Sequence, residues 1–307
     1  MEVKFFLLDA DYIVEGEKTK IRLWGKTEDG KNAVFFQEAD PYFYVLPNDL
    51  KGAKSDIEEL LKKERLFFKK IEIAKMKLAG NEKEFLKIFA FKPANTQNLR
   101  EKIKLLEEKR GGKGYVIDEF EYAINFYRKF LIDKKIDGCC WLKAKGEKIH
   151  TSYNVDFALN LKELSPLGEI FLPKLKTLAF DIETVEKKGE KEIIMASFFG
   201  KEFQKVITSQ KANYPKWVEL VKNEKELLEK IVKIFQEQNP DILFTYYGDS
   251  FDFRVLAQRC EKNKVKLLLS RDKKETKFAK RAKISAFRIP GIVHVDLFNF
   301  VQNILSP

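Results

Sequence analysis

The strongest constraint on this fold is the order of apolar segments in the second half of the sequence. Short apolar runs there alternate with longer amphipathic ones, a pattern that predicts strands alternating with helices. Asn223 and Glu226 form a capping box that begins one helix, and Pro240 ends it. The expected strands cover residues 177–182, 192–199, 205–208 and 241–246, and the last is followed by a helix over residues 250–263. This order predicts an α/β fold.

The first half predicts a mixed α+β domain. Alternating apolar residues separated by Gly or Asp-Gly turns indicate strands over residues 3–8, 20–24, 33–36 and 41–46. A capping box at Ser55 and Glu58 predicts a helix through Glu64. Further helices are expected from residue 95 or 96 to Gly111-Gly112 and over residues 121–133.

The segment between these regions is rich in glycine and proline, including Gly146 and Pro166. Such residues are typical of turns and loops, so we place the domain junction there. We expect an N-terminal domain over residues 1–134, a junction over residues 135–174 and a second domain over residues 175–307.

Composition narrows the partners and the compartment. The 307 residues suffice for two hydrophobic cores, and 58 Lys and Arg against 47 Asp and Glu give a net charge of +11. This excess favours a polyanionic partner such as DNA. The apolar runs are too short for a membrane span or a secretory signal, and the three cysteines have neither disulfide nor zinc spacing. We therefore expect an intracellular, cytoplasmic protein without a membrane partner.

Three acidic residues near strand ends form the strongest candidate site. Asp181 and Glu183 are two residues apart, so a strand points both to one face while Phe180 and Ile182 point to the other. Asp252 begins the helix after the next buried strand. If the two strands are neighbours, the carboxylates converge and could hold two Mg²⁺ or Mn²⁺ ions about 4 Å apart, which suits attack of water on a phosphodiester. Taken singly, each acid is more often a solvated strand end or, for Asp252, a complement to the helix dipole.

The segments around these acids resemble a known family. Residues 178–184, LAFDIET, resemble the first exonuclease motif of archaeal-type family B DNA polymerases, and residues 246–253, YYGDSFDF, resemble the second. Residues 8–13, 130–133 and 294–298 fit the same family in the same order. The resemblance implies a ribonuclease H-like 3′→5′ proofreading domain. Its catalytic residues and metal ligands would be Asp181, Glu183 and Asp252, and its nucleic-acid contacts would include Tyr247 and Phe253.

The sequence departs from this family at two places. Tyr247 stands where the family usually has Asn, and a phenol cannot reproduce the paired donor and acceptor of an amide. After Asp296 we find no counterpart of the third exonuclease motif or of the polymerase domains. We interpret Asp296 as the N-cap of a helix over residues 297–304 rather than as the missing acid. The expected exonuclease domain is therefore incomplete at its C-terminus and weakly active or inactive alone.

The N-terminal domain of the same family carries a pocket that recognises uracil in the template strand. A flipped base needs an aromatic or apolar wall, polar groups at its edge and cations near the phosphates. Thr96 stands where the family tends to have an apolar residue, and Lys129 where it has Arg. The resemblance places the pocket at Tyr12, Pro41, Tyr42, Thr96, Arg100, Phe126 and Lys129. The aromatic members are equally compatible with an ordinary core.

Residues 262–288 are unusually basic, with only Asp272 and Glu275 opposing many Lys and Arg. One interpretation is a solvated hairpin. Beside a nuclease site, however, the segment would follow a phosphate backbone. The expected DNA contacts are Lys273, Lys274, Lys280 and Arg281.

The leading functional hypothesis is the N-terminal and proofreading portion of a family B DNA polymerase. It would be either a truncated product or one piece of a split enzyme whose second polypeptide carries the polymerase domain. The alternative is a non-catalytic DNA-binding module that uses the N-terminal pocket and the basic segment. Metal-dependent turnover distinguishes the two hypotheses.

Overall fold

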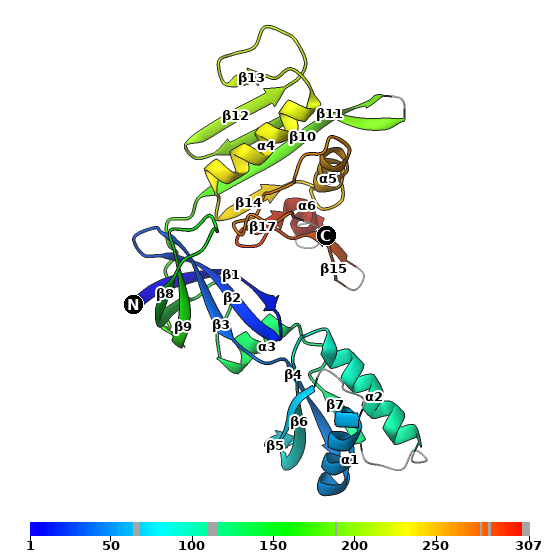
Figure 1. Ribbon diagram of the computed structural model, residues 1–307. Helices are drawn as coiled ribbons and strands as arrows, with labels where there is room; N and C mark the ends of the chain where they lie inside the picture. Colours follow the sequence, from blue (N-terminus) through cyan, green and yellow to red (C-terminus); the bar gives the residue numbers. More distant parts are fainter. Residues whose placement is uncertain (64–67, 110–115, 188, 277, 282–283, 303–307) are drawn as a thin grey trace. The chain divides into compact units, whose positions relative to one another are not determined.

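The computed structural model describes residues 1–307 except 64–67, 110–115, 188, 277, 282–283 and 303–307 (Figure 1). The chain divides into two compact units. Unit 1 comprises Met1–Asp9, Leu23–Val34 and Gly138–Pro307, and unit 2 comprises Ala10–Arg22 and Phe35–Asp137. Within the described residues, every helix is too short or too polar to span a bilayer.

Five strands close a barrel in the order β1-β2-β3-β9-β8. They are β1 (Glu2–Glu15), β2 (Lys18–Thr27), β3 (Asn32–Glu38), β8 (Trp141–Ile149) and β9 (Phe157–Pro166). The last two lie in the interval 135–174, where the sequence predicts a junction. Gly146 shows why the prediction fails: it lies at a β-bulge, where a Cβ atom would come 2.1 Å from the carbonyl oxygen of Asn160. This glycine permits close strand packing and does not interrupt the strand.

Unit 2 contains a four-stranded sheet in the order β5-β6-β4-β7 and three helices. The strands are β4 (Tyr42–Pro47), β5 (Phe68–Leu78), β6 (Asn81–Ala90) and β7 (Val116–Phe120), and the helices are α1 (Leu50–Lys63), α2 (Asn95–Lys109) and α3 (Phe126–Asp133). Helix α2 begins at Asn95, as predicted. Its predicted end at Gly111 and Gly112 lies outside the described residues.

Two helices of unit 2 begin elsewhere than predicted. Helix α1 begins at Leu50 because Asp49 Oδ1 accepts hydrogen bonds from the backbone N–H groups of Lys51 and Gly52, each at 3.2 Å. The expected cap at Ser55 therefore lies inside the helix. Helix α3 begins at Phe126 and not at the expected Glu121, whose left-handed φ of 63° excludes that residue from a helix.

Unit 1 contains a six-stranded sheet in the order β13-β12-β11-β10-β14-β17. Strand β10 runs antiparallel to β11 and parallel to β14. The bounds are β10 (Thr177–Lys187), β11 (Glu190–Gly200), β12 (Phe203–Thr208), β13 (Val218–Leu220), β14 (Ile242–Thr245) and β17 (Val293–Asp296). This arrangement confirms the predicted α/β, ribonuclease H-like fold. A separate hairpin pairs β15 (Phe278–Arg281) with β16 (Ile284–Phe287).

The helices of unit 1 are α4 (Glu224–Gln238), α5 (Asp252–Lys262) and α6 (Leu297–Phe300). Helix α4 begins as predicted, because Asn223 Oδ1 accepts from the backbone N–H of Glu226 at 3.0 Å. It lies across the sheet (Figure 1) and packs on β11 and β12. The ring of Phe180 on β10 lies 5.2 Å from that of Phe235 on α4 and 6.1 Å from that of Phe253 on α5. Burying these rings fixes which face of β10 is turned away from the core.

Candidate functional site

The acidic residues of β10 lie on the face opposite the core. Asp181 and Glu183 are exposed, whereas Phe180 and Ile182 are buried. Strand β10 pairs in parallel with β14, with Ala179 opposite Phe244. Helix α5, which Asp252 begins, follows β14. The predicted alternation along β10 is therefore confirmed, and the condition for convergence, that the two strands are neighbours, is met.

Asp252 is a buried acid held against β10. Its side chain is 2% exposed, and its Oδ1 accepts a hydrogen bond of 3.2 Å from the backbone N–H of Ile182. Burial, and after it the Asp181 carboxylate, raise the pKa of Asp252 to about 6. Desolvation and then the charge of Glu183 raise the pKa of Asp181. In the described part of the chain, neither aspartate has a Lys or Arg at ion-pair distance, so no cation there offsets their repulsion, and the backbone N–H of Ile182 opposes the rise in both pKa values only in part.

The chemistry of these donors fits a divalent cation, because carboxylate oxygens are the ligands that Mg²⁺ and Mn²⁺ prefer. The geometry is more limited. Over the described ranges, no three His, Cys, Asp or Glu side chains lie close enough together to hold a metal ion. Asp181 affects the titration of Asp252, and Glu183 that of Asp181, so the acids interact in pairs. The predicted convergence of three is not formed, and the register of β10 shifts directly after Glu183.

Asp296 is the N-cap of α6, as interpreted from the sequence. Its Oδ1 accepts hydrogen bonds from the backbone N–H groups of Phe298 at 3.1 Å and Tyr247 at 2.8 Å. Its Oδ2 accepts from the backbone N–H of Asp249 at 3.0 Å. The last two bonds hold the turn between β14 and α5, a role that sequence reasoning missed because Asp296 is 47 and 49 residues from its partners.

The two aromatic residues predicted to contact nucleic acid differ in access. Tyr247 is 43% exposed and its ring lies edge-on to Phe298, with centroids 4.6 Å apart. Phe253 is completely buried and stacks on Phe287, with centroids 4.3 Å apart. Its prediction as a nucleic-acid contact is therefore wrong for this structure, because the first turn of α5 directs it into the core.

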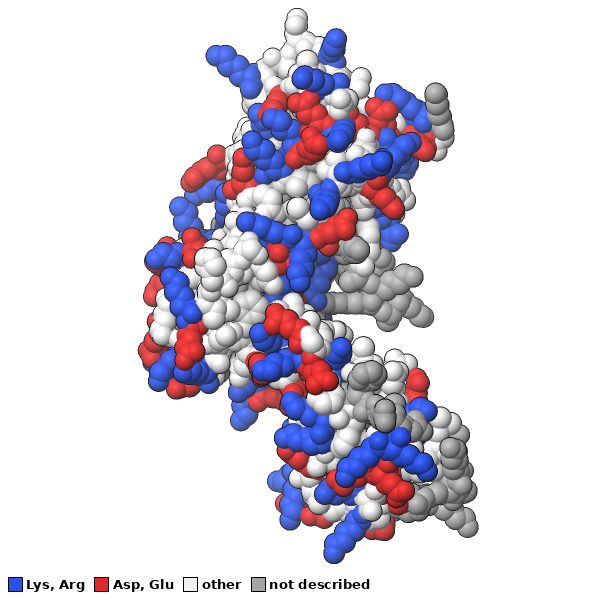
Figure 2. Space-filling view, viewed as in Figure 1, with Lys and Arg blue, Asp and Glu red and all other residues white. Residues whose placement is uncertain are grey.

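Much of the charge in the basic segment is neutralised within the protein. Arg271 is 1% exposed and its Nη2 lies 2.8 Å from Asp241 Oδ1. Lys262 pairs with Glu190, whereas Lys273 and Lys274 are exposed. The side chains of Lys280 and Arg281 lie outside the described residues. Basic and acidic side chains are interspersed on the face seen in Figure 2. Of the four DNA contacts predicted in this segment, Lys273 and Lys274 are the two whose side chains the structure describes, and both are exposed to solvent.

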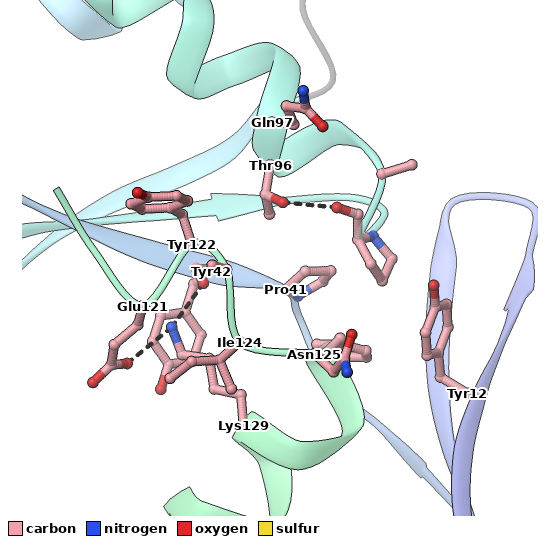
Figure 3. Close-up of a pocket in the computed structure, with 14 residues that line it drawn as sticks. Tyr12, Pro41, Tyr42, Thr96, Gln97, Glu121, Tyr122, Ile124, Asn125 and Lys129 are labelled. Atoms are coloured by element: carbon pink, nitrogen blue, oxygen red, sulfur yellow. Dashed lines mark hydrogen bonds and ion pairs between the residues drawn. The ribbon is translucent and has the colours of Figure 1, made fainter. Parts of the chain in front are cut away.

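Unit 2 contains a pocket of about 310 Å³ (Figure 3). Six of the seven residues expected for uracil recognition line it, namely Tyr12, Pro41, Tyr42, Thr96, Phe126 and Lys129. Arg100 is not among the lining residues: it pairs with Glu119, and its guanidinium carbon lies 3.7 Å from the centroid of the Tyr122 ring. Sequence reasoning missed Glu121 and Tyr122, which line the pocket from the turn before α3.

Two polar groups predicted for this pocket, those of Lys129 and Thr96, already have partners within the protein. Lys129 is 4% exposed, and its Nζ donates to the carbonyl oxygen of Tyr42 at 2.8 Å and pairs with Glu121 at 3.0 Å. Burial lowers the pKa of Lys129, although Glu121 opposes this. Thr96 Oγ1 donates to the carbonyl oxygen of Pro93 at 2.7 Å. The exposed ring of Tyr12 stands edge-on to Phe126, with centroids 5.5 Å apart. The pocket thus combines an aromatic wall with a buried, neutralised cation.

Comparison with known proteins identifies relatives along the whole chain. It is 31% identical over 307 residues to a DNA polymerase of Thermococcus sp. strain GE8, and 32% identical over 310 residues to a DNA polymerase of Pyrococcus glycovorans. These alignments cover 98% of this chain but 16% and 35% of the two relatives. The chain therefore spans only a part of the length of the relatives it matches.

A solved structure supports the fold. The chain superimposes with a TM-score of 0.80 and 23% identity on the family B DNA polymerase from the hyperthermophilic archaeon Pyrobaculum calidifontis, covering 98% of this chain and 37% of that one. The family model described as "DNA polymerase family B, exonuclease domain" matches residues 117–307. Because this match covers more than half of the sequence and includes all three strand-end acids, the chain belongs to DNA polymerase family B, in the region of its exonuclease domain.

Proposed function

We propose that this chain binds the 3′ end of a DNA strand and contributes Asp181, Glu183 and Asp252 to metal-dependent 3′→5′ hydrolysis in proofreading. The observation that carries the proposal is the buried Asp252 carboxylate beside Asp181, with no neutralising cation among the described residues. A buried acid whose pKa is raised by a second acid is destabilising for the fold. Such an arrangement is typical of a site that binds a cation for function.

The residues of the site have separable roles. Asp181 and Asp252, with Glu183, would hold divalent ions, which would supply Lewis-acid polarisation of the scissile phosphodiester. The backbone N–H of Ile182 orients Asp252, and Asp296 fixes the turn that carries Tyr247 between β14 and α5. Protonation of Asp252 below about pH 6 removes one ligand charge. A bound divalent ion competes with this proton, so hydrolysis is expected to decline at a pH below the pKa of the metal-free site.

Metal binding tests the proposal directly. Millimolar Mn²⁺ should raise the melting temperature of the 307-residue chain, because the ion binds the folded site and relieves repulsion there. Asp181→Ala should abolish the shift. Glu229→Gln, on the exposed face of α4, should retain it and serves as the control. A wild-type melting curve that is indifferent to Mn²⁺ would contradict the site.

Hydrolysis is a second, separate measurement. Since the acids interact in pairs and do not form a group of three, we expect weak digestion of a 3′-labelled single strand by the isolated chain. Robust digestion that Asp252→Ala abolishes would show that the carboxylates rearrange on binding metal or DNA. Mn²⁺ binding without digestion would keep the site and reject an independent nuclease.

A second candidate function is supported by the pocket of unit 2. We propose that it accepts a uracil base flipped out of a template strand, with Tyr12 and Phe126 as the aromatic wall. The convergence of six predicted residues on one pocket carries this proposal. Its volume of about 310 Å³ is at the lower end of the usual range for small-ligand sites.

Two substitutions test the pocket. Tyr12→Ala should narrow the difference in affinity between uracil-containing and thymine-containing oligonucleotides, because it removes an exposed wall residue without emptying a core. Lys75→Ser removes an exposed cation of β5 outside the pocket lining, so it should leave that difference unchanged. Equal affinities for both oligonucleotides in the wild type would reject uracil recognition.

A further inference from the structure

Unit 1 contains another pocket that takes no part in the function proposed above. Its volume is about 480 Å³, and it lies where β10 begins, beside the turns that join β2 to β3 and β11 to β12. The basic residues that line it are Lys26, Lys174, Lys176 and Lys201. Glu202 is the carboxylate that lines it among the described residues. The pocket therefore has an excess of positive charge.

Lys26 is held in place and neutralised. Its Nζ lies 2.6 Å from Asp241 Oδ2 and 3.3 Å from Asn32 Oδ1. The same Oδ2 accepts a hydrogen bond of 2.7 Å from the backbone N–H of Lys176. These contacts fix one wall of the pocket and the backbone at its edge. They do not neutralise the side chains of the other three lysines, Lys174, Lys176 and Lys201.

Lys174, Lys176 and Lys201 have no carboxylate at ion-pair distance within the described ranges. Nearby lysines behave differently, since Lys205 and Lys230 both lie 2.7 Å from Glu219 oxygens. Burial lowers the pKa of Lys176, Asp241 opposes that change, and the charge of Lys26 adds to it. Glu202 also acts against the lowering at Lys176, but this one carboxylate balances only part of the charge of the three ammonium groups that border the cavity, so the cavity keeps the positive excess that an anion site requires.

The remaining wall is apolar. Leu175, Leu178 and Phe203 line the same cavity, and Phe203 also packs against the hydrophobic core. The volume lies within the range of small-molecule sites, about 300–1,000 Å³. A cavity with lysines on one part of its lining and an aromatic ring on another suits a small ligand that has both an anionic and a planar apolar part.

We propose that this pocket binds a nucleoside phosphate. The phosphates lie against Lys174, Lys176 and Lys201, and the base lies against Phe203 and Leu175. A concave cavity with an apolar wall favours a mononucleotide over a continuous nucleic-acid strand, which would need an open basic groove. The site is separate from the carboxylates, so metal binding and nucleotide binding can be measured independently.

Calorimetry with ADP and the 307-residue chain tests the proposal. The wild type should bind one ADP, more tightly than adenosine or pyrophosphate. The triple variant Lys174→Ser, Lys176→Ser, Lys201→Ser should bind at least about tenfold more weakly, since it removes charge-assisted hydrogen bonds. The control Lys211→Ser, Lys216→Ser, Lys222→Ser removes the same charge from exposed positions outside the pocket and should bind ADP like the wild type.

Four results would overturn the proposal. The first two are a wild type that shows no saturable binding of millimolar ADP, and an equal loss of ADP affinity in both triple variants. The third is binding of pyrophosphate by the wild type as tight as its binding of ADP. The fourth is a wild type that does not bind ADP while the pocket variant binds a thymidine oligonucleotide more weakly than the wild type does. The third result would indicate a bare anion site and the fourth a path for DNA. The substituted lysines are exposed, so both triple variants should melt close to the wild type.

Discussion

The two flanks of β14 carry buried aspartates in opposite electrostatic settings. Asp241, directly before the strand, is fully buried and lies 2.6 Å from Lys26 Nζ and 2.8 Å from Arg271 Nη2. Asp252, in the helix that follows the strand, is 2% exposed and faces other acids. A buried carboxylate is tolerated when paired and costly when unpaired. Asp241 therefore stabilises the fold, whereas Asp252 is available to a ligand.

The largest expected effect comes from breaking the neutralised flank. Asp241→Asn leaves Lys26 and Arg271 without their shared carboxylate, so the free energy of unfolding should fall by about 3–5 kcal/mol. Chemical denaturation measures this, with the exposed Glu229→Gln as a control that should change it by less than about 0.5 kcal/mol. A loss no greater than that of the control would show that Asp241 does not hold the fold, and the comparison would fail.

A smaller effect of opposite sign is expected at the other flank. Without metal, Asp252→Asn should stabilise the protein by about 1–2 kcal/mol at neutral pH, because it removes a buried charge beside Asp181. The pKa of Asp252 is raised from 3.8 to about 6, so the wild type loses relative stability as the pH rises across that interval. The variant's advantage should therefore grow from pH 3.8 to about 6 and then level off.

Melting curves in EDTA across this pH range measure that advantage. Asp249→Asn is unsuitable as a control because Asp249 Oδ1 accepts a hydrogen bond from the Phe287 backbone. Glu186→Gln is the control, because Glu186 is an exposed acid on β10, the strand whose Ile182 N–H holds Asp252, and its side chain has no such bond among the described residues. Millimolar Mn²⁺ should stabilise the wild type more than Asp252→Asn. A variant that is less stable than the wild type at neutral pH in EDTA would show that the buried charge is compensated.

The acidic flank was predictable from the sequence, whereas the neutralised flank was not. Strand alternation around Asp181 and Glu183 is a local pattern, and it also predicts that Phe180 is buried. The pairing of Asp241 joins residues 215 and 30 positions away, and no spacing rule encodes such contacts. The sequence therefore shows Arg271 only as one of the basic residues of segment 262–288, whereas the structure buries it against Asp241.

The remaining errors have the same origin. Ser55 and Glu58 satisfy the capping pattern, but Asp49 supplies the cap one turn and a half earlier through contacts that only the folded turn shows. Arg100 was placed in the pocket of unit 2, whereas its pairing with Glu119 holds it outside. Local periodicity thus predicts which face a residue occupies. The hydrogen-bond or ion-pair partner of a side chain depends on tertiary contacts, which local periodicity does not predict.

The smallest expected effect contrasts two exposed lysines with the buried arginine beside them. Lys273 and Lys274 are exposed and have no ion pair in the part of the chain that the structure describes. Replacing both with Ser should change the free energy of unfolding by less than about 0.5 kcal/mol. The slope of log affinity against log salt for a single-stranded oligonucleotide should flatten by about 0.7 for each phosphate contact that is lost.

Fluorescence anisotropy at several salt concentrations measures this slope, and Lys225→Ser with Lys233→Ser is the matched control. Those lysines are also exposed, but Glu229 and Glu237 already oppose them at 4.0 and 3.6 Å, so their loss should leave the slope unchanged. Uracil-containing and thymine-containing strands should lose affinity alike, because phosphate contacts carry no base information. If the slope of the Lys273 and Lys274 variant equals that of the control, the charge of this segment does not contact DNA. The segment would then act through internal ion pairs such as that of Arg271 with Asp241, which stabilises the fold.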